Sequence, residues 1–219
     1  MWYNRRMCKE KGCVIRALAA IALCFGLSAG ASAEINETAE WQGRIDAAAA
    51  SGGGRVVVPA GTHVVASLEL KSGVTLELSD GATLLASTNR ADYLRIENNW
   101  KKLAVLYACG ATNIAVVGSG RMDGRGDALG YSEEGPDRWR MIHFRDCTGV
   151  TVENIRIENS NYWTTFYERC RKVVLRGLVI RSQTNFNNDG IDLEVADALV
   201  ENCDIDTDDD AVCFKSHAP

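Results

Sequence analysis

Two acidic groups near the C-terminal end of the sequence hold the residue types and spacing that suit acid–base chemistry. The first occupies residues 187–192, and the second occupies residues 204–215. Asp189 and Asp210 lie 21 residues apart. If the chain winds in coils of about that length, carboxylates of both groups meet on one face, where their repulsion raises the apparent pKa of at least one. A protonated carboxyl beside an ionised one is what hydrolysis of a glycosidic bond requires.

The same residues suit two other structures. Three consecutive aspartates, residues 208–210, are also typical of a solvated acidic turn. The alternating aspartates of residues 204–208 suit a calcium loop, but the EF-hand pattern fails, because Asp209 stands where a glycine is needed and Lys215 stands where the bidentate glutamate belongs. A calcium site of another kind stays open.

Short strands must position these groups. Past residue 55, apolar and polar residues alternate in short runs separated by Gly, Asn, Asp and Ser, which indicates strands. The runs are residues 55–58, 73–78, 114–117, 150–152, 155–157, 173–175 and 178–180. Residues 37–50 form the one helix-like segment in this reading. The chain is therefore predicted to be all-β with one short N-terminal helix.

The strand pairs repeat along the chain. Residues 147–157 are echoed 23 residues later by residues 170–180, and a third copy begins at Ala198, 25 residues after Val173. Paired short strands with Asn or Gly between them, at a period of 20 to 30 residues, indicate a solenoid. We predict a right-handed parallel β-helix whose first coil is capped by the helix. An antiparallel sandwich is the alternative, but it does not explain the repeat.

In such a solenoid, equivalent residues of successive coils stack. The repeat predicts two internal ladders: Val150, Val173 and Ala198 form one, and Ile157, Ile180 and Ile205 form the other. Polar residues between them, such as Thr151, Arg156 and Asp204, are expected on the outside.

The first 33 residues read as a signal peptide. Five basic residues precede an apolar run at residues 17–27, and Ala31-Ser32-Ala33 supplies the small residues of a cleavage site. The run is about half the length that a membrane span requires. We predict cleavage after Ala33, a secreted or periplasmic β-helix domain at residues 34–219, and no membrane association after cleavage.

Charge and cysteine content limit the partners. Hydrophobic residues make up 46% and charged residues 24%, as in a soluble protein with a core. Without residues 1–33 the formal net charge falls from -5 to about -9, which argues against nucleic acid but allows an anionic sugar polymer held by a few local cations. Five cysteines remain without C-x-x-C spacing, which argues against zinc. Cys147, Cys170 and Cys203 are expected to act as small core residues.

An ordered set of motifs resembles a known family. Residues 187–190 (Asn-Asn-Asp-Gly) and 207–216 (Thr-Asp-Asp-Asp-Ala-Val-Cys-Phe-Lys-Ser) resemble the N-T-D-G and G-D-D motifs of glycoside hydrolase family 28, the polygalacturonases and related pectin hydrolases. Residues 52–62, 118–124 and 159–163 resemble the early coils of that family. The resemblance covers residues 37–216.

The resemblance implies inverting hydrolysis of α-glycosidic bonds in pectic polysaccharides by a monomer with no cofactor or metal. It assigns Asp209 as the general acid, and Asp189 and Asp210 as the residues that activate water. Inversion requires acid and base carboxyls about 6.5–9.5 Å apart. Since adjacent strand residues point to opposite faces, a local turn must bring Asp209 and Asp210 together. Lys215 could bind a substrate carboxylate, or it could neutralise the aspartates.

Two departures from the family pattern limit what carries over. Asn188 replaces the usual Thr and Asp208 replaces the usual Gly, which leaves the choice between homogalacturonan and rhamnogalacturonan open. The later His-Gly and Arg-x-Lys motifs of the family would fall beyond residue 219, so the chain is expected to be an incomplete N-terminal portion. His217 lies too close to the paired aspartates to be that histidine, and it is expected at the surface.

Four aromatic residues could stack on sugar rings or fill packing gaps: Trp100, Trp139, Tyr162 and Trp163. Two other functions remain on the same fold. One is a calcium-dependent pectate lyase, and the other is a non-catalytic carbohydrate-binding β-helix.

Overall fold

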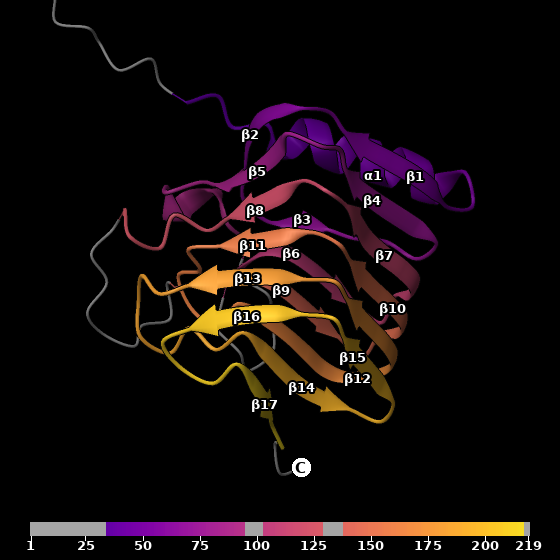
Figure 1. Cartoon of the computed structure of the whole chain (residues 1–219). Coiled ribbons are helices and arrows are strands. Elements are labelled where there is room, and N and C mark those ends of the chain that lie inside the picture. Colours follow the sequence, from indigo (N-terminus) through magenta and orange to yellow (C-terminus); the bar gives the residue numbers. More distant parts are fainter. Residues whose placement is uncertain (1–33, 95–102, 129–137, 217–219) are drawn as a thin grey trace, which may run out of the picture. The chain divides into compact units, whose positions relative to one another are not determined.

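A computed structural model describes residues 34–94, 103–128 and 138–216. The predicted signal peptide, Trp100 and His217 lie outside these residues. Residues 34–219 form one compact unit, in which short strands wind into stacked coils (Figure 1). Every strand pair in the described part of the chain is parallel, which contradicts the sandwich alternative and confirms the predicted right-handed parallel β-helix.

Each coil contributes one strand to each of three faces. The six-stranded sheet stacks β2 to β16 as successive rungs in Figure 1. It contains β2 (Gly61–Val65), β5 (Ala82–Ala86), β8 (Arg121–Asp123), β11 (Arg156–Glu158), β13 (Val179–Ser182) and β16 (Asp204–Thr207). The β1 face contains β1 (Gly54–Val58), β4 (Val74–Leu78), β7 (Thr112–Gly118), β10 (Thr148–Glu153), the second half of β12 (Thr165–Arg176) and β15 (Ala198–Glu201).

The third face is called the β3 face, and the connecting segments that lead into its strands hold the three predicted site aspartates. It contains β3 (Leu68–Glu69), β6 (Leu103–Cys109), β9 (Trp139–Arg145), the first half of β12, β14 (Ile191–Val195) and β17 (Val212–Phe214). The 12-residue strand β12 runs around a corner and joins the β1 and β3 faces into one sheet.

Both predicted ladders are confirmed by the strand register. Val150 pairs with Val173, and Val173 pairs with Ala198; the isoleucine ladder pairs in the same way. Apolar residues of successive coils therefore stack into one continuous core. Ala198 is exposed, since it belongs to the last coil that the structure describes.

Left-handed backbone marks the corners between faces. Asn154, Gly177 and Asn202 stand at the same corner of successive coils, each with a φ between 54° and 62°. Asn and Gly tolerate this region with little strain, which explains why they separate the paired strands in the repeat.

The N-terminal helix covers the first coil as predicted. Helix α1 (Thr38–Ala50) buries Trp41 and Ile45 against β1, β3 and β4. A short 3-10 helix, η1 (Arg90–Asp92), lies between β5 and β6. No helix in the described residues is long and apolar enough to cross a membrane.

Two of the cysteines behave as predicted. Cys147 and Cys170 are buried as free thiols, whereas Cys203 is partly buried at the last described coil.

Candidate active site

Three connecting segments stack on one another where the six-stranded sheet gives way to the β3 face. They are residues 159–164, 183–190 and 208–211, which lead into β12, β14 and β17. The Thr164 amide donates to the Asp189 carbonyl at 2.7 Å, and the Gly190 amide donates to the Asp210 carbonyl at 2.8 Å. Asp189 and Asp210 therefore lie in neighbouring coils, as their 21-residue spacing predicts.

A glycine allows this close stacking. A Cβ on Gly190 would lie 2.6 Å from the Ala211 carbonyl oxygen and 2.7 Å from a methyl carbon of Ile205. The residue that follows Asp189 must therefore lack a side chain for the two segments to approach.

The three aspartates that the sequence singles out come together. One carboxylate oxygen each of Asp189, Asp209 and Asp210 lies within 4.8 Å of the others. Asp209 and Asp210 belong to a bend between β16 and β17, and the Asp210 amide donates to Asp209 Oδ1 at 2.9 Å. The predicted local turn is thus present. Asp209 and Asp210 are exposed, whereas Asp189 is buried.

One oxygen from each of the three carboxylates lies within 4.8 Å of the other two. The separation of about 6.5–9.5 Å expected for inversion is defined between whole carboxyl groups, so distances between single oxygens neither meet nor exclude it. The inverting outcome therefore has no support from this distance.

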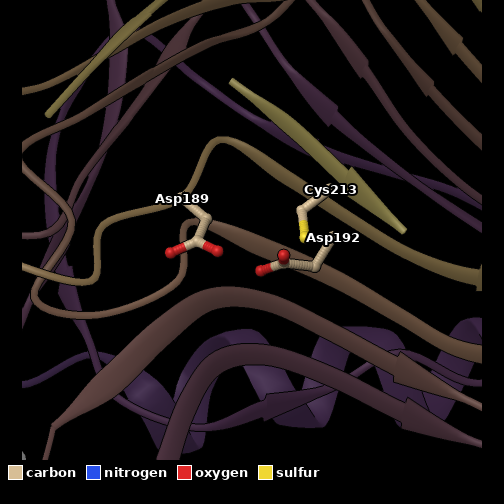
Figure 2. Close-up of side chains that lie close together, drawn as sticks. All are labelled: Asp189, Asp192 and Cys213. Carbon is tan, nitrogen blue, oxygen red and sulfur yellow. The ribbon is translucent and has the colours of Figure 1, made fainter. Parts of the chain in front are cut away.

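The aspartate with the raised pKa is Asp192, which sequence reasoning did not single out. It lies between the core residues Ile191 and Leu193 of β14, so its side chain points outward from the β3 face, yet it is fully buried. Burial, followed by the charge of Asp189, raises the pKa of Asp192 to about 7. Figure 2 shows Asp189, Asp192 and Cys213 turned toward one another.

Lys215 supplies positive charge to both buried aspartates. Its Nζ donates to Asp189 Oδ2 at 2.8 Å and lies 3.1 Å from Asp192 Oδ1. Burial alone would lower the pKa of Lys215, but the hydrogen bonds and charges of the two carboxylates raise it above its ordinary value. Of the two predicted roles, the structure shows the neutralising contact, and a contact of Lys215 with substrate stays a prediction.

A second cation, Arg140, is buried near Asp189 and Asp192. Arg140 of β9 is fully buried, and none of its three side-chain nitrogens has a hydrogen-bond partner among the described residues. Its guanidinium carbon lies 4.9 Å from the Trp163 ring centre and 5.1 Å from that of Tyr162. Burial lowers the pKa of Arg140 to about 10, although the charges of Tyr162, Asp192 and Glu168 oppose this effect.

The three candidate sugar-stacking residues that the structure describes, Trp139, Tyr162 and Trp163, pack against neighbouring side chains. Trp139 and Tyr162 are buried, which favours the packing role of the two roles that the sequence left open. Trp163 stacks on Tyr162 with ring centres 5.2 Å apart, and the Lys215 Nζ lies 4.2 Å from the centre of the Trp163 ring. Trp163 therefore binds neighbouring side chains of its own chain.

A buried histidine–carboxylate pair lies further along the β3 face. His143 Nε2 lies 2.9 Å from Glu168 Oε2, and both side chains are buried. Burial, which the hydrogen bond to Glu168 opposes, lowers the pKa of His143 to about 4, so its imidazole is neutral near pH 7. Burial would raise the pKa of Glu168, but His143, Arg145 and Arg169 outweigh it and lower the value to about 2.

Two groups of described residues bring three potential cation-binding atoms within 4.8 Å. One consists of Asp189, Asp192 and Cys213, and the other consists of Asp189, Asp209 and Asp210. In the first group the Lys215 ammonium already lies against both carboxylates. The calcium alternative therefore depends on the second group, in which Asp209 and Asp210 are exposed and Asp189 is buried.

Comparison with known proteins decides the family. The model of the glycosyl hydrolases family 28 matches residues 50–218. The chain belongs to glycosyl hydrolase family 28. A polygalacturonase from Ralstonia solanacearum is 30% identical over 133 residues, which are 55% of this chain and 24% of that protein. The chain thus spans about a quarter of that relative's length.

Solved structures agree on the fold. The family 28 exopolygalacturonase of Yersinia enterocolitica has a TM-score of 0.71 at 25% identity, covering 83% of this chain and 42% of that one. The polygalacturonase of Erwinia carotovora ssp. carotovora has a TM-score of 0.73 at 21% identity, covering 84% of this chain and 56% of that one.

Proposed function

We propose that this family 28 chain carries the three-aspartate part of an active site that hydrolyses α-glycosidic bonds in galacturonic-acid-containing polysaccharides. The convergence of Asp189, Asp209 and Asp210 from neighbouring coils supports this function most directly. Membership of the family and the likeness to polygalacturonases support the class of substrate.

In the proposed reaction, Asp209 donates its proton to the glycosidic oxygen as the bond to the anomeric carbon breaks. Asp189 and Asp210 orient a water molecule and take its proton as the water oxygen bonds to that carbon. The exposure of Asp209 suits an acid that must reach the substrate. One carboxylate oxygen of Asp189 lies within 4.8 Å of oxygens of Asp209 and Asp210, which suits shared activation of one water molecule. Inversion belongs to the proposal through the family resemblance, and proton NMR of the first sugar released tests it.

The proposal is tested by measuring reducing ends released from polygalacturonate and rhamnogalacturonan by the 219-residue chain. We expect Asp209→Asn to lower the rate by about 10²-fold or more, since general acid catalysis contributes that much. Asp208→Asn is the matched control, because it removes the same charge from the same bend. Equal rates in wild type and Asp209→Asn would refute the assignment.

Two other functions predict different results. A calcium-dependent lyase would lose activity with a chelator and release an unsaturated product that absorbs ultraviolet light. A non-catalytic binding protein would bind the polysaccharide equally well with Asn at position 209 and would release no reducing ends in either form.

We also propose that residues 1–33 direct export and are removed after Ala33, and that the exported chain is a monomer. The order of basic, apolar and small residues supports the first point. The N-terminal sequence and the sedimentation mass of the exported protein test both.

A further inference from the structure

Lys215 has three contacts that together fix its ammonium group. Nζ lies 2.8 Å from Asp189 Oδ2, 3.1 Å from Asp192 Oδ1 and 4.2 Å from the centre of the Trp163 ring. The side chain is only 20% exposed. An ammonium group has three donors and no acceptor, so two carboxylates and an aromatic face account for its main interactions.

Asp189 depends on Lys215 for its side-chain orientation. Asp189 Oδ2 accepts from Lys215, whereas Oδ1 has no hydrogen-bond partner among the described residues. The Asp189 backbone is held separately, because its carbonyl accepts from the Thr164 amide. The lysine contact is therefore the side-chain hydrogen bond that holds the Asp189 carboxylate, one oxygen of which lies within 4.8 Å of oxygens of Asp209 and Asp210.

Asp192 is placed to hold Lys215 rather than to meet a substrate. Its side chain is fully buried, between Phe166 and Cys213 in the strand register. The groups that act on it from the surrounding elements are Arg140 of β9, Asp189, Cys213 of β17 and Lys215. A carboxyl group in this position gives the Lys215 ammonium a second oxygen partner, 3.1 Å away.

We propose that Lys215 is a positioning residue: it holds the Asp189 carboxylate in place beside Asp209 and Asp210, and Asp192 and Trp163 hold Lys215 in place. This inference rests on the proposed function, because it concerns the residue that activates water there. It replaces direct substrate binding as the main role of Lys215.

The kinetic test compares Lys215→Met with the matched control Lys172→Met, which removes an exposed lysine from β12. Methionine keeps much of the apolar stem and removes the charge. We expect Lys215→Met to lower kcat on the order of 10²-fold, as misplacement of a reacting group does, and to change KM by less than about twofold. A raised KM with unchanged kcat would overturn the proposal, because it is the result expected of a substrate-binding lysine.

A double variant shows whether Lys215 acts through Asp189. In an Asp189→Asn background, Lys215→Met should have little further effect on kcat, since the carboxylate that it positions has gone. If the double variant instead lost kcat by the product of the two single-variant factors, the two residues would act independently and the proposal would be contradicted.

A measurement that needs no activity tests the contact itself. Amine acetylation of the whole chain, followed by mass spectrometry, should modify Lys215 more slowly than Lys172. Asp192→Asn and Trp163→Leu should each raise the Lys215 rate while leaving the Lys172 rate unchanged. Equal acetylation rates at the two lysines in wild type would refute the proposal that neighbouring side chains hold Lys215 in place. An inactive wild type with a protected Lys215 would instead refute the proposed function and the catalytic part of this inference, while confirming the contact.

Discussion

Asp192 is a carboxyl group that the fold buries completely beside another carboxylate. Burial and the charge of Asp189 disfavour its ionised form, while Lys215 partly compensates. Its pKa is therefore raised from the ordinary 3.8 to about 7. The native state keeps a proton that the unfolded chain has already lost between these pH values. Because the native state then binds more protons than the unfolded state, the free energy of unfolding falls as pH rises from about 4 to about 7.

Asp192→Asn should remove this dependence. We expect the variant to gain stability relative to wild type as pH rises from 4 to 8, by at most about 4 kcal/mol for a shift of about three pKa units. Chemical denaturation at pH 4, 6 and 8 measures the difference. Asp197→Asn, at an exposed site, is the control and should show no such trend. A constant difference between wild type and Asp192→Asn across the range would contradict the buried, protonated carboxyl.

At the scale of the element, the corners of the coils depend on left-handed backbone. Gly177 has a φ of 61°, and a Cβ there would lie 2.4 Å from Asn154 Oδ1 of the preceding coil. Gly110 has nearly the same φ, 65°, but a Cβ there would meet nothing within 4 Å. A side chain at Gly110 would therefore meet backbone strain alone, whereas a side chain at Gly177 would meet the same strain and a steric clash as well.

Alanine at each site measures the two contributions. Gly110→Ala should lower the free energy of unfolding by about 1–2 kcal/mol through strain alone. Gly177→Ala should cost more, because the Asn154 side chain must also move. Combining Gly177→Ala with Asn154→Gly should recover the excess, and urea denaturation measures all three. Equal losses in the two single variants would show that the corner accommodates the methyl group freely.

At the scale of the whole molecule, the site lies in an acidic chain. The formal net charge is -5 for the full sequence, and the proposed substrate is itself a polyanion. Long-range repulsion therefore opposes their encounter. Salt shortens the range of that repulsion from about 30 Å at 0.01 M to about 10 Å at 0.1 M.

We accordingly expect the KM for polygalacturonate to fall as sodium chloride rises from 0.01 M to 0.1 M. Initial rates at several substrate concentrations measure it, with a short neutral substrate analogue as the control. A KM that rises with salt would instead show that local cations near the site dominate the encounter.

The repeat in the sequence is enough to predict the coil, the ladders and the approach of Asp189 to Asp210. In a parallel solenoid, neighbours across coils are separated by one repeat, so a 23- to 25-residue period is enough to pair Val150 with Val173 and Val173 with Ala198. The same reasoning placed Asp189 beside Asp210. These contacts follow from the register between strands of successive coils, and the repeat length in the sequence is enough to predict that register.

The bend that Asp209 and Asp210 share, and the groups that surround the aspartates, are seen only in the folded chain. The alternation Ile191-Asp192-Leu193 predicts an outward residue, and nothing local shows that the stacked segments and Lys215 cover it. The positions of Arg140 and Trp163 depend in the same way on side chains from separate coils. The burial of Arg140, the partial burial of Trp163 and the lowered pKa of Arg140 arise because side chains from several coils pack together away from water. The repeat period of the sequence does not predict which side chains these are.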